Sequence, residues 1–397
     1  TPNSFSLLTE VEVLTEIEAT ALDNEKKIVK AKNLKNNEEE IFSYDKLIIA
    51  TGASPIMPNI PGINLPGVFK LRNPDDAEAI RNYANQNGIK DIVIAGASFI
   101  GLEVADALNI QGLNVTVIDG RNQVLPDIID IEMANFVKKN LLKHNVKVIN
   151  NTLITGINGS NSITGVETET LSIPCQMVVM AVGIKANTNF LTDTGLELDS
   201  GKIVVDNKLQ TNLPDVYAIG DCAMVTNRMT GTRKYSPMGS SANLQGRTLA
   251  QVINGKDVSY PGVLGTGVIR LPGLNVGRTG LGEDDAKALG YDVITTVAIT
   301  DDKAHYYEDA SFFITKLIAD KTTHKLLGAQ VIGTGNVDKM IDIAVTGINM
   351  DAKLEDFENG DYAYAPPFST AIHPFVQAVY ILLNKISGDF TSITPRE

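Results

Sequence analysis

The chain has 397 residues, which is long for a single core and favours two or three domains. Its formal net charge of −13 disfavours nucleic acid or an anionic membrane surface as a partner. The only two cysteines, Cys175 and Cys222, form no C-x-x-C pair, which argues against a disulfide framework and fits a cytoplasmic protein. No apolar run approaches the roughly 18 residues of a membrane span, and the four histidines are dispersed, so neither a membrane segment nor a metal site is predicted.

Strands and helices alternate along the first half of the chain. Residues 47–50 and 91–95 are short apolar runs that end at glycine-containing turns, which predicts buried parallel strands. The stretch between them is rich in proline and glycine and is predicted to be a linker, with a change of domain near residue 72. A helix over 99–111 and a strand over 115–119 complete one βαβ unit.

The character of the sequence changes twice more. A second junction is predicted near residue 190. From about residue 263 onward, glycine-rich turns separate hairpin-like runs such as 311–318, and a last helix is predicted over 375–385. The fold class that these elements predict is α/β.

The turn after the strand at 91–95 has the composition of a dinucleotide site. Gly96 permits a tight strand-to-helix turn, Gly101 lets the helix pack closely, and the amides at Ser98 to Ile100 can meet a pyrophosphate. A packing turn without a ligand would explain the two glycines equally well. Asp119, at the end of the next strand, favours the nucleotide because a carboxylate there can accept from the ribose hydroxyls, so NADH is preferred over NADPH. Arg121 keeps NADPH possible.

Six segments in a fixed order resemble the coenzyme A disulfide reductase, NADH oxidase and NADH peroxidase family of FAD-dependent pyridine nucleotide-disulfide oxidoreductases. They are residues 44–53, 96–103, 181–183, 216–223, 242–247 and 364–369. The resemblance implies two Rossmann-like domains, for FAD and NAD, and a C-terminal α+β dimerisation domain. It assigns residues 1–72 and 191–262 to FAD, 73–190 to NAD(P), 263–391 to dimerisation and 392–397 to the remnant of a linker.

The same resemblance implies a role for each motif residue. Those expected at FAD are Thr51, Gly52, Gly220, Asp221, Met238, Gly239 and Ser240, with Asp221 on the ribityl chain. Gly183 joins the cofactor-binding set, Glu103 is expected near the nicotinamide amide, and Phe99 is expected to cover the flavin until nicotinamide displaces it. An N-cap explains Asp221 without FAD, and a place in the core explains Phe99 without a gate.

Two tyrosines of the C-terminal part resemble the acid groups of coenzyme A disulfide reductases. There, tyrosines of the neighbouring subunit protonate the leaving thiolate, and Tyr364 and Tyr307, or Tyr306, match their positions. A phenol suits this step because its basicity is similar to that of a thiolate. Aromatic packing at a dimer interface is the alternative for Tyr306. His373 stands in a run that commonly reads Ala-Lys-Asp-Pro in this family, which places coenzyme A specificity in question.

The implied function is transfer of a hydride from NADH through FAD to a disulfide, persulfide, peroxide or oxygen acceptor in a homodimer. The family's redox cysteine and FAD fingerprint are expected upstream of Thr1, because residues 1–5 resemble the segment that follows both. A flavoprotein that reduces a small redox protein and a non-catalytic dimeric scaffold are the alternatives.

Overall fold

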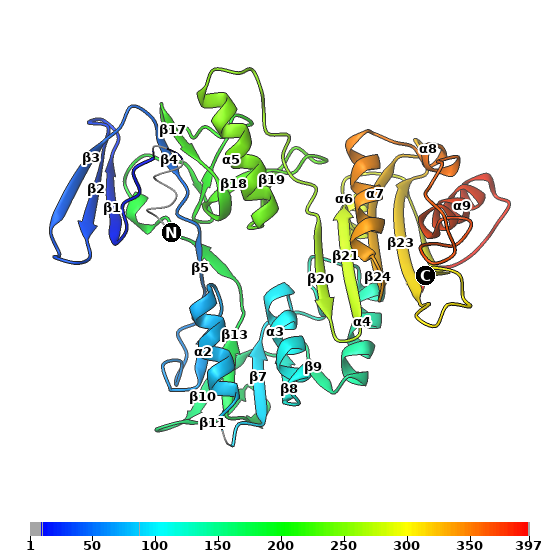
Figure 1. The fold of residues 1–397 in the computed structure, drawn as a ribbon, viewed down its shortest axis with the longest axis horizontal. Coiled ribbons are helices and arrows are strands. Elements are labelled where there is room, and N and C mark those ends of the chain that lie inside the picture. Colours follow the sequence, from blue (N-terminus) through cyan, green and yellow to red (C-terminus); the bar gives the residue numbers. More distant parts are fainter. Residues whose placement is uncertain (1–8, 10, 87, 396–397) are drawn as a thin grey trace. The chain divides into compact units, whose positions relative to one another are not determined.

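The computed structural model describes residue 9, residues 11–86 and residues 88–395, so the sequence comparison at residues 1–5 and the end of the predicted linker at 396–397 lie outside the described residues. The chain folds into two compact units (Figure 1). The first comprises the segment that ends at Ser54 together with Ile184–Val263. The second comprises Pro55–Gly183 together with the segment that begins at Leu264.

The first unit combines small sheets with one long helix. The predicted strand at 47–50 is confirmed as β4 (Leu47–Ile49), which pairs in parallel with β17 (Val216–Ala218). Helix α5 (Gly239–Ile253) packs its buried Leu249 into the same core. The remaining elements are β1 (Ile17–Asp23), β2 (Ile28–Asn33), β3 (Glu39–Ser43), β5 (Ala53–Pro55), β14 (Ile184–Ala186), η1 (Asn189–Leu191), β15 (Leu198–Asp199), β16 (Lys202–Val204), η2 (Gly220–Cys222), β18 (Ala223–Thr226) and β19 (Arg233–Tyr235).

The second unit begins with a five-stranded parallel sheet in the order β6-β13-β7-β8-β9. The predicted βαβ unit is confirmed, because β7 and β8 pair in parallel and α3 connects them. Residues Ile92, Val93 and Ile94 of β7 are almost completely buried, as expected for a strand covered on both faces. The elements are β6 (Val68–Lys70), α2 (Pro74–Ala84), β7 (Asp91–Ala95), α3 (Phe99–Ile110), β8 (Asn114–Ile118), α4 (Ile131–Lys143), β9 (Val146–Ile149) and β13 (Met177–Met180), with a small antiparallel sheet of β10 (Ile154–Gly159), β11 (Ile163–Thr168) and β12 (Ser172–Pro174).

The proline-rich stretch before residue 72 belongs to this second unit. Its strand β6 pairs with β13, and Gly62 packs against Ile157, where a Cβ would lie 2.0 Å from the carbonyl oxygen. The compact units divide after Ser54 and after Gly183, while the domain boundaries near residues 72 and 190 stay a prediction. A three-residue strand among prolines leaves too short an apolar run to be recognised from periodicity.

The C-terminal part is a five-stranded antiparallel sheet in the order β20-β21-β24-β23-β22. Helices α7 and α9 share a core with it, while α3 packs against β20 and α4 against β24. Apolar residues of both sheets consequently form one buried cluster. The predicted hairpin and last helix are confirmed. The elements are β20 (Gly267–Leu271), β21 (Leu274–Gly280), α6 (Glu283–Ala288), β22 (Val293–Asp301), β23 (Phe312–Asp320), β24 (Leu326–Gly333), α7 (Val337–Asn349), α8 (Leu354–Glu358) and α9 (Pro374–Ser387).

Candidate active site

Neither Gly96, in the turn between β7 and α3, nor Gly101, in the first turn of α3, has space for a side chain. Gly96 has a φ of +108°, and a Cβ there would lie 2.2 Å from the carbonyl oxygen of Ala181. A Cβ at Gly101 would lie 1.9 Å from the carbonyl oxygen of Gly96. Ser98 is the N-cap of α3, yet its hydroxyl makes no capping bond, and Ile100 is exposed. The first-turn amides of α3 are therefore suited to a phosphate.

The structure brings Asp119 to this turn. One carboxylate oxygen, Oδ2, accepts from the amide of Ala97 at 2.6 Å, and Oδ1 accepts from the amide of Arg121 at 2.7 Å. Since an ionised carboxylate offers about four lone-pair sites, capacity remains for two ribose hydroxyls. The guanidinium of Arg121 forms an ion pair with Asp127.

Phe99 and Glu103 lie one turn apart on α3. The ring of Phe99 is half-buried against Gly267 of β20, where a Cβ would lie 2.8 Å from the ring. Glu103 is exposed to solvent, but partial burial of its carboxyl group and the neighbouring Asp106 raise its pKa above the usual range. Gly183, with a φ of +121°, follows β13 at the same edge of the sheet as Gly96, because β13 and β7 run in parallel.

In the first unit, Thr51 and Gly52 are fixed by Asn187. The Thr51 hydroxyl donates to the Asn187 carbonyl at 2.8 Å, and the Asn187 amides donate to the carbonyls of Thr51 and Gly52 at 3.0 and 2.9 Å. Gly52 has a φ of +67°, which favours glycine. This segment thus turns sharply at the end of β4.

The Gly220–Asp221 pair lies beside the start of α5. The amide of Gly220, which has a φ of +74°, donates to the side-chain oxygen of buried Gln245 at 2.7 Å. The carbonyl of Asp221 accepts from the Tyr235 hydroxyl at 2.8 Å. Met238 is the N-cap of α5 and provides no side-chain capping bond, while Gly239 and Ser240 are exposed in the first turn. The carboxylate of Asp221 can accept from hydroxyls, and the uncapped amides of α5 can donate to carbonyl oxygens.

Both cysteines, Cys175 and Cys222, are buried, and neither forms a disulfide. Burial raises the pKa of the Cys175 thiol to about 12. Burial also raises the pKa of Cys222, whose Sγ lies 3.5 Å from the carbonyl oxygen of Ile49 in the first unit. Neither thiol is poised as a nucleophile, because the reactive form is the thiolate.

The loops that carry Tyr307 and Tyr364 lie next to each other. The amide of Ala304 donates to the carbonyl of Pro366 at 3.2 Å. Tyr364 is 53% exposed, and Tyr307 is partly exposed with its ring centroid 5.3 Å from that of Tyr306. The structure therefore brings these two predicted acid groups to one region of the C-terminal part.

Comparison with known proteins decides the family. Residues 3–243 match the family described as pyridine nucleotide-disulphide oxidoreductase, and residues 272–375 match its dimerisation domain. The chain belongs to the pyridine nucleotide-disulphide oxidoreductases. It is thus an FAD-dependent enzyme that uses a pyridine nucleotide, with the α/β fold and dimerisation domain that the sequence predicts.

Several members of the family resemble the chain closely. It is 36% identical over 349 residues to the NAD(P)H sulfur oxidoreductase (CoA-dependent) of Pyrococcus furiosus, covering 87% of this chain and 78% of that protein. It is 33% identical over 388 residues to the NADH oxidase of Methanocaldococcus jannaschii, covering 98% of this chain and 86% of that protein. The structure of an NAD-dependent persulfide reductase from A. fulgidus matches with a TM-score of 0.94 and 36% identity, covering all of this chain and 73% of that chain.

Three contacts in this pyridine nucleotide-disulphide oxidoreductase have no sequence motif that predicts them. They are the hydrogen bonds of Asn187 to the Thr51 segment, the packing of the Phe99 ring against Gly267, and the ion pair of Arg121 with Asp127. In the sequence, His373 stands out only as a departure from the family pattern. In the structure it is the N-cap of α9, where its Nδ1 accepts from the amide of Phe375 at 3.2 Å.

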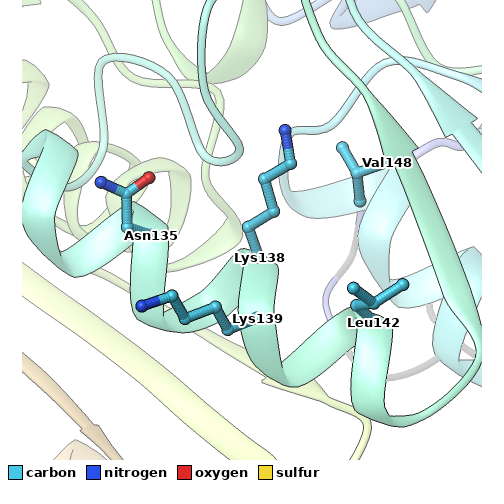
Figure 2. Close-up of a pocket in the computed structure, with 5 residues that line it drawn as sticks. All are labelled: Asn135, Lys138, Lys139, Leu142 and Val148. Carbon is cyan, nitrogen blue, oxygen red and sulfur yellow. The ribbon is translucent and has the colours of Figure 1, made fainter.

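Among the surface hollows formed by the described residues of the second unit, one of about 270 Å³ lies on α4 and β9. Figure 2 shows the residues that line it, Asn135, Lys138, Lys139, Leu142 and Val148. It contains no residue of the predicted site. Another, of about 210 Å³, lies beside the Tyr364 loop, where Pro367, Phe368 and Ser369 face the starts of α7 and α9. This second hollow is the one adjacent to the predicted acid groups.

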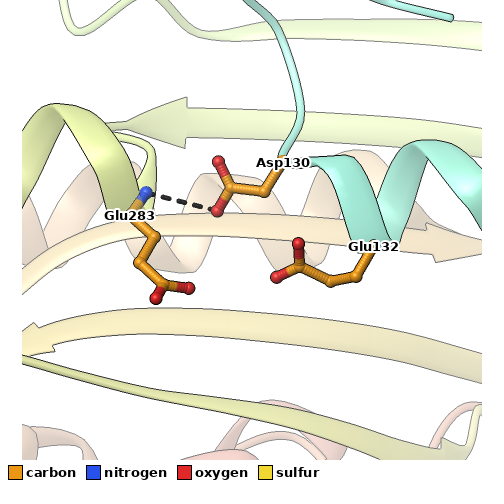
Figure 3. Close-up of side chains that lie close together, drawn as sticks. All are labelled: Asp130, Glu132 and Glu283. Carbon is orange, nitrogen blue, oxygen red and sulfur yellow. Dashed lines mark hydrogen bonds between the residues drawn. The ribbon is translucent and has the colours of Figure 1, made fainter. Parts of the chain in front are cut away.

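Three acidic side chains of the second unit converge on one point, as Figure 3 shows for Asp130, Glu132 and Glu283. The ammonium of Lys316 fills that point, at 2.7 Å from Asp130 and 2.6 Å from Glu283 and in contact with Glu132. Burial opposes the charge on Lys316, but Asp130 and the other two carboxylates outweigh burial and raise the pKa of Lys316. The cluster is an internal ion network that joins α4 to the C-terminal sheet.

None of the helices formed by the described residues is both long and apolar enough to cross a membrane.

Proposed function

We propose that the enzyme uses NADH to reduce a small sulfur acceptor, either a persulfide or coenzyme A disulfide. The observation that carries this proposal is the pairing of the Tyr307 and Tyr364 loops by the Ala304–Pro366 hydrogen bond. An exposed phenol and a partly exposed phenol at one place suit protonation of a departing thiolate. The similarity to a CoA-dependent sulfur oxidoreductase and a persulfide reductase supports the same acceptor class.

In this proposal, residues of the second unit bind the nicotinamide coenzyme and residues of the first unit bind FAD. Gly96, Gly101 and the first-turn amides of α3 bind the coenzyme pyrophosphate, and Asp119 accepts from the adenosine ribose. Asp221 binds the ribityl hydroxyls of FAD, and the uncapped first turn of α5 meets the flavin carbonyls. When bound, FAD supplies the chemistry of taking a hydride from NADH and releasing two electrons to the acceptor.

The assembly we propose is a homodimer with shared active sites. In it, the C-terminal tyrosines of one subunit serve the flavin of the other, which the match of residues 272–375 to a dimerisation domain supports. We assign residues up to 54 and 184–263 to FAD, 55–183 to the nicotinamide coenzyme, and 264–391 to dimerisation. We also propose a cytoplasmic location, which the two unpaired thiols support.

Anaerobic stopped-flow absorbance of the FAD-loaded enzyme tests this function. NADH should bleach the visible flavin bands, and a persulfide or coenzyme A disulfide should restore them faster than hydrogen peroxide or a small redox protein. Faster restoration by peroxide, by oxygen or by a redox protein would assign the acceptor to that class instead. A protein without visible flavin bands would contradict the proposal altogether.

A further inference from the structure

The guanidinium of Arg121 is held by Asp127, although its backbone lies next to the ribose-binding carboxylate. The amide of Arg121 donates to Asp119, and its carbonyl accepts from the amide of Asn151 at 2.9 Å. The amide and the carbonyl of Arg121 are therefore both held by hydrogen bonds, and only its side chain can change direction. That side chain is 57% exposed and pairs with the Asp127 carboxylate, which is 77% exposed.

Asp127 is itself fixed relative to the dinucleotide turn. The amide of Leu125 donates to the carbonyl of Ala97 at 2.8 Å, and Leu125 and Val124 are completely buried. Leu125 and Asp127 both have left-handed backbones, with φ of +48° and +62°. This conformation is uncommon without glycine and turns the chain back toward Arg121. The Asp127 carboxylate thus stays within reach of the guanidinium whenever the loop is folded.

We propose that Asp127 is a specificity residue that holds Arg121 away from the coenzyme and so strengthens discrimination against NADPH. A 2'-phosphate would have to displace the Asp127 carboxylate from the guanidinium before it could form its own bidentate pair. Replacement of Asp119 alone leaves that obstacle in place. Use of Arg121 to bind the phosphate after Asp119→Ser therefore requires a second change, at Asp127. The inference rests on the proposed use of NADH.

Binding of adenosine 2',5'-bisphosphate, compared with 5'-AMP, tests this on the FAD-loaded enzyme by calorimetry. Asp127→Asn should tighten binding of the bisphosphate about 5- to 10-fold and leave the affinity for 5'-AMP within about twofold. The reason is that the guanidinium of Arg121 loses its carboxylate partner and becomes available to the 2'-phosphate. The gain should disappear when Arg121→Gln is also present. The double variant Asp119→Ser, Asp127→Asn should have a higher ratio of kcat/KM for NADPH to kcat/KM for NADH than Asp119→Ser alone.

The matched control is Asp257→Asn, which removes a carboxylate from another exposed ion pair, with Lys208 in the first unit. This control variant should leave the affinity for both nucleotides unchanged. A gain that persists with Arg121→Gln would mean that Asp127 acts by simple repulsion, and an unchanged bisphosphate affinity would also overturn the inference. Failure of the wild-type enzyme to bind 5'-AMP or to oxidise NADH would overturn the proposed function as well.

Discussion

Asp119 and Asp221 each follow a short parallel strand closely, but their surroundings differ. Asp119 accepts from two backbone amides and is therefore a structural part of its turn. Asp221 lies in the short helix η2, where the amide of Gly220 donates to the side-chain oxygen of Gln245. A change at Asp119 should therefore disturb the turn itself as well as ligand binding.

Asp221→Ala should weaken retention of FAD about 10- to 100-fold, because hydrogen bonds to a charged acceptor are worth about 1.5–3 kcal/mol. The flavin-to-protein absorbance ratio after dialysis measures this. Asp257→Ala, an exposed change of the same charge in the same unit, is the control. Full flavin occupancy in Asp221→Ala would mean that the aspartate serves only the local turn.

Tyr364→Phe removes a hydroxyl while it keeps the exposed ring in place. We expect the acceptor half-reaction to slow about 10²-fold or more, the typical contribution of a positioned acid, while flavin reduction by NADH stays within about twofold. Stopped-flow measurement of each half-reaction separates the two. Tyr306→Phe, a change of the same kind in the neighbouring loop, tests whether the effect belongs to Tyr364. Equal slowing of both half-reactions would assign Tyr364 to packing.

At the scale of elements, the start of α9 depends on a neutral imidazole. Nδ1 of His373 must be unprotonated to accept from the amide of Phe375, and the ring stacks on Tyr362 at 4.9 Å. Burial lowers the pKa of His373 below its usual value of 6.5. The unfolded chain therefore binds a proton that the folded chain does not, at pH values between the folded pKa and 6.5.

Stability should accordingly fall as the pH drops below about 6.5, the unfolded pKa of histidine. His373→Asn keeps an N-cap side chain but removes the titration, so its Tm should depend less steeply on pH than that of the wild type between pH 7 and 5. His373→Ala should lose about 0.5–2 kcal/mol at pH 7 through loss of the cap. Parallel Tm profiles for wild type and His373→Asn would contradict this account.

Elements with strong local signals could be predicted from the sequence, whereas contacts between distant segments could not. The βαβ unit was predicted correctly because apolar runs and Gly96 mark its ends. Strand β6 was missed because proline and glycine flank its three residues. The pair of Arg121 and Asp127 depends on left-handed backbones at residues other than glycine, for which sequence has no simple signature. Gly267 meets Phe99 only through tertiary packing.

At the scale of the whole molecule, residues 55–183 and the C-terminal sheet belong to one compact unit. The ion network around Lys316 lies within it, with Asp130 and Glu132 from one side and Glu283 from the other. Removal of one member of a buried network leaves the others without compensation, which costs more than the network itself contributes.

Lys316→Met should therefore destabilise the enzyme by about 3–5 kcal/mol, because three buried carboxylates would lose their shared cation. Differential scanning calorimetry should show a fall in Tm of several degrees or more. Lys339→Met, which alters an exposed lysine on α7, is the control and should leave Tm nearly unchanged. A wild-type Tm in Lys316→Met would mean that the network contributes nothing to the stability of the fold.

The buried cluster shared by the two sheets also has a consequence for folding during synthesis, because its members lie far apart in the sequence. Met133 and Val137 of α4 pack with Ile269, Ile314 and Ile332 of the C-terminal sheet. The ribosome makes the first group before segment 184–263 and the second group after it. A nascent chain that ends before Leu264 therefore presents an apolar face without its covering strands, the kind of surface that chaperones bind. Residues 55–183 can therefore complete this core only once the last strands have been synthesised.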